Sequence, residues 1–386
     1  MPESDPKDSY VAILDLQNII LKGGKESIER HKTYLDTLHN ITPQQQKINL
    51  RIFAPFEKRF TKYYKDYNFI VPIKTNALIK WPSFILKIIK IIHKDRKYIN
   101  MLIAGDPWFP AILSIFISKI IKSRILVQTQ IHADLGSEEW RKLSIKNNVK
   151  FALSRYTLCA SDSIRFVSEE QYRKVACKIK IDPNKVFVAG IIYQLPEKPI
   201  IKKLNTDKVN IGMIGRISSD RGLNEFTKII YKLNSLELYF DLYIAGSGKQ
   251  QKTFQRELIK THKLGDVFFL GHIEGEELIN FWRKINFCIF TPQSESFGRG
   301  LREALANSTP IWSTNTSGFE ELEHKFKCNE IKQISSEMSN ENLLNAFNDT
   351  KNIKVEFDYM KYFKNEQRKD LDKLVESFVQ TRKLET

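Results

Sequence analysis

The sequence predicts two Rossmann-like α/β domains joined by a short linker. The chain has 386 residues, more than one hydrophobic core usually serves. In each half, short apolar runs alternate with segments of helical period, the pattern of a parallel sheet with crossover helices. Residues 195–208 hold two prolines and several lysines without periodicity, so we expect a linker there, between domains at 1–194 and 209–358. Residues 359–386 predict an amphipathic C-terminal helix that packs back toward the first domain.

The expected elements follow in chain order. In the first half, apolar runs predict strands at 10–16, 48–53, 69–73, 101–104, 124–130, 163–167 and 185–189, with helices at 25–39, 82–93, 110–121, 139–159 and 170–178. In the second half, strands at 209–214, 240–245, 267–270, 287–290 and 310–313 alternate with helices at 224–233, 249–263, 276–285 and 301–307. Such sheets bind ligands outside their strand C-termini, so two facing domains would share one interdomain cleft.

The formal net charge of +16 is concentrated in the first half: residues 1–200 carry +14 and residues 201–386 carry +2. Residues 51–100 alone hold 12 basic and 3 acidic side chains. A basic surface of this kind attracts anionic lipid headgroups, lipid-linked phosphates or nucleic acid. Residues 74–97 interleave lysines with isoleucines, which fits either a helix in a membrane interface or an ordinary helix packing its apolar stripe on the sheet.

Cysteine usage and hydropathy indicate the compartment. The cysteines are Cys159, Cys177, Cys288 and Cys328, and their wide spacing predicts a reducing compartment and no structural zinc. The first ten residues are acidic and polar, unlike a signal peptide, and the apolar stretches at 81–93 and 109–121 are too short to span a bilayer. We therefore expect a cytoplasmic chain, soluble or peripheral on the inner face of the membrane.

A glycine- and arginine-bearing turn follows the first strand of the second half. Gly215 allows a tight turn, and Arg216 and Arg221 flank the start of the next helix, which suits a pyrophosphate. Two surface arginines beside a βα turn are the alternative. The Gly-Ser-Gly at 246–248 is a weaker signal, and a simple tight turn explains it equally well.

Two glutamates follow the apolar run at 287–290. Glu295 falls in the loop after this strand, and Glu303 lies eight positions later in the next helix. Both could face a ligand at the strand C-terminus. A favourable position near a helix start, or an i,i+4 pair between Arg299 and Glu303, would also account for them.

Taken together, these patterns resemble the C-terminal domain of the retaining glycosyltransferases of family 4, which have the GT-B fold. The matching segments are Gly215-Arg216 with Arg221-Gly222, Ala245-Gly-Ser-Gly248, Phe269-Leu-Gly271, Glu295 to Glu303 with Phe297-Gly298, Pro310-Ile311 and Gly318-Phe-Glu320. The match covers about residues 209–323. It departs from the family at Arg221, where Lys is usual, at Ser296, where Gly is common, and at Asn307-Ser308, which replace Ala-Gly.

The resemblance implies a role for each matching residue. Arg216 and Arg221 would bind the donor diphosphate and stabilise the leaving group, Glu303 would hold the ribose, and Glu295 would contact the sugar. The remaining donor contacts would come from Gly215, His272, Ile273, Phe297, Gly298 and Arg299, with His272 and Ile273 at the nucleobase.

The first half resembles the family's acceptor domain less closely. Gly23 and Gly24 follow the first strand, where a glycine pair would approach the donor phosphates or the acceptor; a flexible turn is the alternative. His132, at a strand C-terminus, matches the family residue near the transferred sugar. Ser168-Glu169 matches a Ser-Glu pair at the interdomain cleft.

The expected function is therefore transfer of a sugar, by a retaining hexosyltransferase, from a nucleotide-sugar to a glycan or lipid-linked acceptor, in assembly of a cell-surface polysaccharide or glycolipid. The resemblance implies no cofactor and no metal, since arginines would stabilise the departing diphosphate. An anionic membrane surface could contact residues 51–100. A nucleotide-sugar epimerase of the same fold is one alternative. A basic nucleic-acid-binding protein is another, but the sequence holds no binding motif for it, so no nucleic acid partner is expected.

Overall fold

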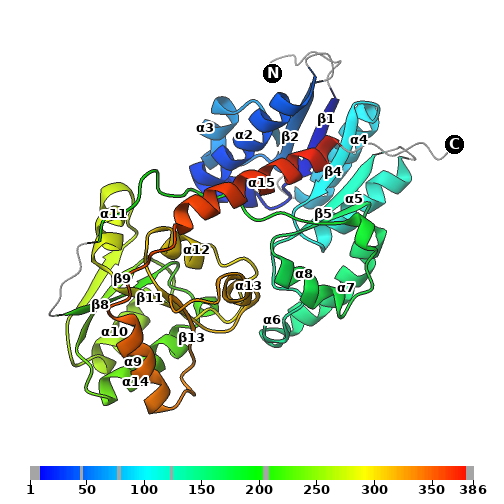
Figure 1. The fold of residues 1–386 in the computed structure, drawn as a ribbon. Coiled ribbons are helices and arrows are strands. Elements are labelled where there is room, and N and C mark those ends of the chain that lie inside the picture. Colours follow the sequence, from blue (N-terminus) through cyan, green and yellow to red (C-terminus); the bar gives the residue numbers. More distant parts are fainter. Residues whose placement is uncertain (1–8, 44–46, 76–79, 122–124, 203–207, 380–386) are drawn as a thin grey trace. The chain divides into compact units, whose positions relative to one another are not determined.

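Each half of the chain forms a parallel β-sheet with connecting helices (Figure 1). The computed structural model describes residues 9–43, 47–75, 80–121, 125–202 and 208–379. Unit 1 comprises Met1–Gly136, Arg141–Tyr193 and Gln367–Thr386, and unit 2 comprises Ser137–Trp140 and Gln194–Glu366. Most of the first ten residues, part of the expected linker and the last residues of the expected C-terminal helix lie outside the described residues. The prediction of two Rossmann-like α/β domains is confirmed.

Unit 1 contains a seven-stranded sheet in the order β3-β2-β1-β4-β5-β6-β7. Its strands are β1 Ser9–Leu14, β2 Ile48–Pro55, β3 Ile70–Ile73, β4 Ile99–Ala104, β5 Leu126–Ile131, β6 Ser163–Phe166 and β7 Val186–Val188. The helices in this part of the chain are α1 Ile19–Lys22, α2 Gly24–Ile41, α3 Thr61–Asp66, α4 Lys80–Asp95, α5 Phe109–Ile120, α6 Glu138–Lys142, α7 Ile145–Ala160 and α8 Glu169–Ala176. The strand order reverses between β1 and β4.

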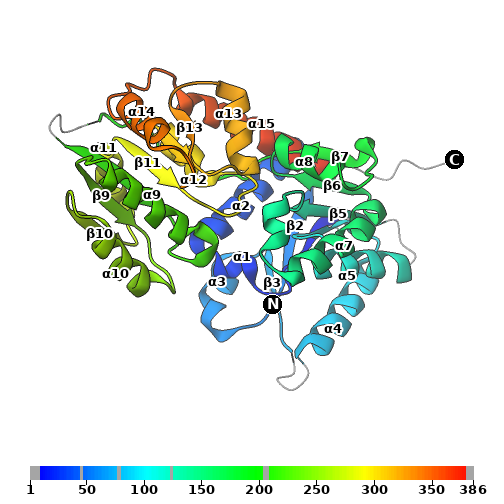
Figure 2. The same cartoon turned by 90° about the horizontal axis from the view of Figure 1, so that it is seen from below.

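Unit 2 contains a six-stranded sheet in the order β10-β9-β8-β11-β12-β13, seen from another side in Figure 2. Its strands are β8 Val209–Ile214, β9 Phe240–Ala245, β10 Val267–Gly271, β11 Phe287–Phe290, β12 Ile311–Ser313 and β13 Ile331–Gln333. Its helices are α9 Leu223–Ser235, α10 Gln251–Thr261, α11 Gly275–Lys284, α12 Arg299–Ala306, α13 Ser317–Phe326 and α14 Asn340–Thr350. Here the strand order reverses between β8 and β11.

Both faces of the first sheet are buried, which explains why its strands are almost continuously apolar. Val11 and Ile13 face one core, covered by α2 and the last helix, α15 Tyr359–Val379. Tyr10, Ala12 and Leu14 face the other core, covered by α4 and α5. This alternation follows from the two-residue period of a strand.

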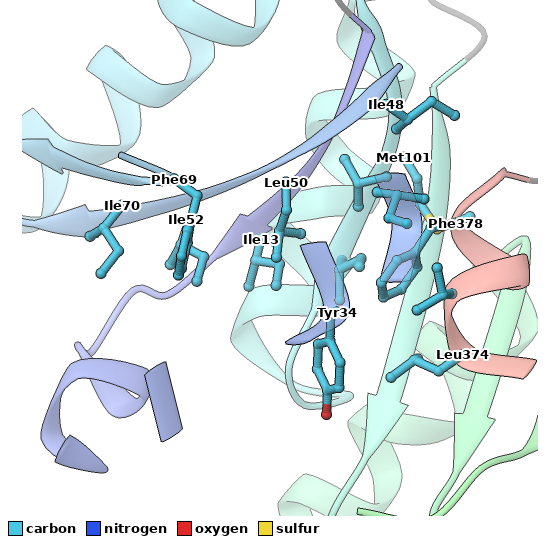
Figure 3. Packing of buried hydrophobic residues seen from close by; sticks show 14 of the residues in the cluster. Ile13, Tyr34, Ile48, Leu50, Ile52, Phe69, Ile70, Met101, Leu374 and Phe378 are labelled. Atoms are coloured by element: carbon cyan, nitrogen blue, oxygen red, sulfur yellow. The ribbon is translucent and has the colours of Figure 1, made fainter. Parts of the chain in front are cut away.

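The C-terminal helix α15 contributes to the core of each unit. Tyr359 and Phe363 belong to the core of unit 2, whereas Leu374 and Phe378 belong to the core of unit 1. Figure 3 shows Leu374 and Phe378 beside strand residues of the first sheet.

The expected helix at 139–159 was wrong, because the chain breaks there into α6 and α7. Ser144 caps α7 by accepting a hydrogen bond from the amide of Lys146 at 3.0 Å, and serine is a favoured N-cap. The sequence also failed to predict the short elements α1, α3, α13, β13 and α14.

Helix α4 packs its apolar stripe on the sheet, as in the ordinary-helix alternative. Phe84, Ile88 and Ile92 are fully buried, whereas Trp81 and Leu86 are exposed. Across the described residues, none of the helices combines the length and the apolar character that crossing a bilayer demands.

Candidate functional site

The loops after β8 and β11 meet at the point where the second sheet reverses its strand order. Gly222, which precedes α9, has φ +63°, and a Cβ added there would lie 1.7 Å from the carbonyl oxygen of Thr291. The Thr291 hydroxyl lies 3.1 Å and 3.0 Å from the carbonyl oxygens of Arg221 and Gly222. These contacts fix the loop that carries Arg221 against the end of β11. Ligands of open α/β sheets bind at such switch points.

The glycines after β8 and β9 allow the loops that follow these two strands to approach each other closely. The amide of Gly215 donates to the carbonyl of Ala245 at 3.0 Å, and a Cβ on Gly246 would lie 1.8 Å from the carbonyl oxygen of Gly215. A Cβ on Gly248 would lie 2.1 Å from the carbonyl oxygen of Ile217. The Gly-Ser-Gly segment therefore lets two loops pack backbone to backbone, which is more than a tight turn requires.

Arg216 and Arg221 both carry ion pairs in this structure. Arg216 is exposed, and its Nη2 lies 3.4 Å from Oδ2 of Asp220. Arg221 is partly buried, and its Nη1 donates to Oε2 of Glu295 at 2.9 Å. The structure thus joins Arg221 and Glu295, which are 74 positions apart in the chain. Asp220 was not predicted as part of the site.

The loop at 295–298 leads into α12, and Gly298, with φ +71°, forms its N-cap. The amide of Gly318 donates to the carbonyl of Glu295 at 2.9 Å, and a Cβ on Gly318 would lie 2.5 Å from the amide nitrogen of Gly298. Phe297 is buried below Arg302, whose guanidinium carbon lies 4.0 Å from the ring centroid. Phe297 therefore supports the loop through the core.

Glu303 forms the i,i+4 pair that was one alternative for it. Its Oε1 accepts from Nε of Arg299 at 2.6 Å. Both residues lie on the first two turns of α12, beside the loop that carries Glu295. That Glu303 binds a ribose and that Arg299 contacts the donor stay predictions.

His272 and Ile273 lie after β10, at the edge of the sheet. His272 is exposed, and its Nε2 lies 2.8 Å from Oε1 of Glu274. Because β10 is two strand positions from β8, the two loops are separated by about 10 Å at the usual strand spacing. A bound molecule would have to be extended to contact both.

A cavity of about 490 Å³ lies in unit 1, at the switch point between β1 and β4. Ile19, Trp108 and Phe109 line it with apolar surface, and His132 lines it from the end of β5. The glycine pair at 23–24 does not line it; these residues join α1 to α2.

Burial shifts the pKa values of polar groups in this cavity. It raises the pKa of Asp15 to about 6, although the carboxylate accepts hydrogen bonds from the amides of Ile19 at 2.6 Å and Ile20 at 2.9 Å. It lowers the pKa of His31 to about 4. His132 is accessible to solvent in the cavity, yet the surrounding protein limits its hydration and lowers its pKa. Both imidazoles are therefore neutral at pH 7.

The sequence did not predict the other polar residues of this cavity. Ser27, Arg30, His31 and Tyr34 line it from α2, and Arg165 lines it from β6. The α2 residues recur at intervals of three and four, so they share one helix face, and this periodicity could have indicated them. Across the described residues, no group of three or more His, Cys, Asp or Glu side chains is arranged to hold a metal ion.

Comparison with known proteins agrees with this arrangement. Residues 196–378 match the family model described as glycosyl transferases group 1. The matched segment, just under half of the chain, is therefore similar to this family. The chain is 23% identical over 290 residues to the capsular polysaccharide biosynthesis glycosyltransferase CapM of Staphylococcus aureus, covering 71% of this chain and 74% of that one.

Solved structures of GT-B glycosyltransferases share the fold of this chain. Alr3699/HepE of Anabaena, solved in complex with UDP-glucose, is 13% identical with a TM-score of 0.63, over 95% of this chain and 99% of that one. The lipopolysaccharide outer core galactosyltransferase WaaB is 13% identical with a TM-score of 0.58, over 93% and 99%.

Proposed function

We propose that this glycosyltransferase homologue moves a hexose from a nucleotide-sugar to a glycan or lipid-linked acceptor, with retention of configuration, as in family 4. The observation that carries the proposal is the convergence of Arg216, Arg221, Glu295 and the start of α12 at the switch point of the matched domain. UDP-glucose bound to HepE supports a nucleotide-sugar as the donor class. The names of CapM and WaaB support cell-surface polysaccharide or glycolipid assembly.

The chemistry requires positioned positive charge. As the sugar–phosphate bond breaks, negative charge gathers on the departing diphosphate, and Arg216 and Arg221 would donate hydrogen bonds to it. Arg221 now pairs with Glu295 at 2.9 Å, so the diphosphate would replace this carboxylate. Glu295 would then be released to accept hydrogen bonds from the donor sugar. Stabilisation by arginines supports a mechanism without a metal ion.

The positive charge of the first half supports a peripheral location of the protein at a membrane. Lys87, Lys90 and Lys94 of α4 are solvent-accessible, and Leu86 is exposed among them. Such lysines favour an anionic lipid surface. We accordingly place the protein in the cytoplasm, at the inner face of the membrane.

The test is calorimetric titration of the protein with UDP, GDP and ADP. We expect one of them to bind and Arg216→Ala to weaken that binding by about 10-fold or more, because hydrogen bonds to charged groups contribute about 1.5–3 kcal/mol. Arg256→Ala is the matched control, since Arg256 is an exposed arginine on α10, away from the strand C-termini. No binding of any of the three nucleotides by the wild type would refute the proposal.

A further inference from the structure

Four basic side chains gather around the cavity of unit 1. Arg30 and His31 come from α2, His132 follows β5, and Arg165 belongs to β6. They lie close enough for the charges of Arg30 and Arg165 to lower the pKa of each histidine, in addition to the larger effect of desolvation. The charge of Arg30 likewise lowers the pKa of Arg165. The two histidines are neutral at pH 7, so the like charges here are those of Arg30 and Arg165, whose mutual repulsion an anion would offset.

Arg165 is the most buried of the four, with 2% of its surface exposed. Its Nε donates to the carbonyl of Ala189 at 3.0 Å, its Nη2 to the carbonyl of Gly190 at 2.5 Å, and its Nη1 to Oε1 of Gln130 at 3.3 Å. All three acceptors are neutral. Burial lowers the pKa of Arg165, and the electrostatic effects of Tyr34 and Asp370, with a side-chain hydrogen bond to Tyr34, offset this only in part. Within the described part of the chain, the guanidinium has no ion pair with a carboxylate.

A chain of hydrogen bonds fixes the orientation of Arg165. Gln130 also donates to Oε1 of Gln128 at 3.3 Å, and Gln128 donates to the hydroxyl of Ser377 at 2.9 Å. Gln128 and Gln130 share one face of β5, and Ser377 belongs to α15. The guanidinium is therefore held in place before any ligand arrives, which lowers the entropic cost of binding.

Arg30 adds a second permanent charge. It is half-buried, and its Nη1 and Nη2 lie 3.5 Å and 3.3 Å from the carbonyl oxygen of Ile192 and the hydroxyl of Ser27. Both acceptors are again neutral, and the described residues offer Arg30 no carboxylate partner.

Two carboxylates also line the cavity, but both are bonded to backbone amides. Asp15 accepts from the amides at the start of α1, and Asp106 accepts from the amide of Trp108 at 2.9 Å. They shape the loops after β1 and β4. Neither forms an ion pair with Arg30 or Arg165 among the residues described.

We propose that this cavity binds an oxyanion, a phosphate or a carboxylate, through Arg165 and Arg30. Ile19, Trp108 and Phe109 line the same space, and Ile19 and Phe109 are exposed. The group bearing the oxyanion therefore has an apolar portion that lies against them. Identifying this molecule as the acceptor rests on the proposed transferase function, whereas binding of the oxyanion rests on the cavity alone.

The experiment measures binding of hexyl phosphate, inorganic phosphate and hexanol to the full chain by calorimetry. We expect hexyl phosphate to bind more tightly than phosphate, and hexanol not to bind. Arg30→Gln and Arg165→Gln should each weaken hexyl phosphate about tenfold, or ~1.4 kcal/mol. Lys32→Gln is the matched control, because Lys32 is exposed on the same helix and does not line the cavity. If Arg165→Gln does not fold, the half-buried Arg30→Gln decides the question.

Each contrary outcome has a distinct meaning. Wild-type affinity for hexyl phosphate in folded Arg30→Gln and Arg165→Gln would overturn the oxyanion site. Equal affinity for phosphate and hexyl phosphate would overturn the inference that the ligand has an apolar portion. If hexyl phosphate and UDP compete, and Arg30→Gln weakens the binding of both, the assignment to the acceptor is overturned and the site binds the donor. Binding of hexyl phosphate without binding of any nucleoside diphosphate would refute the transferase proposal and leave the oxyanion site standing.

Discussion

Replacing Gly222 with alanine tests whether the loop that carries Arg221 depends on its close approach to β11. Gly222 has φ +63°, and an added Cβ would lie 1.7 Å from the carbonyl oxygen of Thr291. Ordinary contacts between such atoms are about 3.5 Å, so the two backbone segments would have to separate by roughly 1.5 Å or more. Arg221 precedes this glycine and would move with it.

The expected cost has two parts. A left-handed backbone costs an alanine about 1–2 kcal/mol. Separation would also break the hydrogen bond between the Thr291 hydroxyl and the carbonyls of Arg221 and Gly222, worth about 1 kcal/mol, and would disturb the packing around it. The two parts sum to about 2–3 kcal/mol, and the disturbed packing adds to them, so we expect the free energy of unfolding of unit 2 to fall by about 3 kcal/mol.

Thermal unfolding followed by circular dichroism measures this loss, with Gly275→Ala as the control. Gly275 also has positive φ, +54°, but its added Cβ would meet nothing within 4 Å. At ~3 °C per kcal/mol, the midpoint should fall by roughly 9 °C in Gly222→Ala and roughly 4 °C in the control. Nucleotide binding should weaken only in Gly222→Ala. Equal losses in the two variants would show that backbone strain alone matters and that the close approach does not.

Two further predictions concern buried cations of unit 2. Arg302 is 1% exposed and pairs with Glu321 at 3.2 Å, so Arg302→Met should cost about 3–5 kcal/mol in chemical denaturation. Glu321 also pairs with Lys325 at 2.9 Å, so combining Arg302→Met with Glu321→Gln should cost less than the sum of the two single losses; an additive double variant would contradict the pairing. Lys202 donates to the carbonyls of Trp282 at 2.8 Å and Ile285 at 3.0 Å, and burial lowers its pKa to about 7. Above pH 7 the unfolded state then binds more protons than the folded state, so the stability contributed by this group rises from about pH 7 to about pH 10. Lys202→Met should lose this rise and the exposed control Lys198→Met should keep it; identical pH profiles of Lys202→Met and the wild type would contradict the reasoning.

The sequence predicted the elements of unit 2 that are encoded over short stretches of chain. Gly215, Arg216 and Arg221 fall within one βα turn, and Glu295 and Gly298 fall within another. Spacing within a turn can be recognised from sequence. The need for a glycine at position 222 could not be recognised from sequence, because its partner Thr291 lies 69 positions away and only the folded sheet brings the two together.

The cavity of unit 1 escaped prediction for a related reason. Arg165 stands in an apolar strand, where a single arginine gives no periodic signal. Its acceptors come from β5 and from the segment after β7, and its orientation depends on Ser377 through two glutamines. Only His132 was indicated, because it ends a strand that resembles one in the family. The polar groups at this site converge from five separate parts of the chain.

The two switch points differ in how their arginines are neutralised, and this predicts different energetics of binding. In unit 2, Arg216, Arg221 and Arg299 each pair with a carboxylate, so an anion must exchange with an existing partner. These pairs are partly exposed, and such pairs contribute only about 0–1 kcal/mol, so the exchange costs little and releases glutamates for hydroxyl groups. In unit 1, Arg165 and Arg30 hold only neutral acceptors, so an anion breaks no ion pair when it binds. The two proposals therefore predict that a sugar diphosphate exchanges with carboxylates in unit 2, whereas an oxyanion enters a preformed site in unit 1.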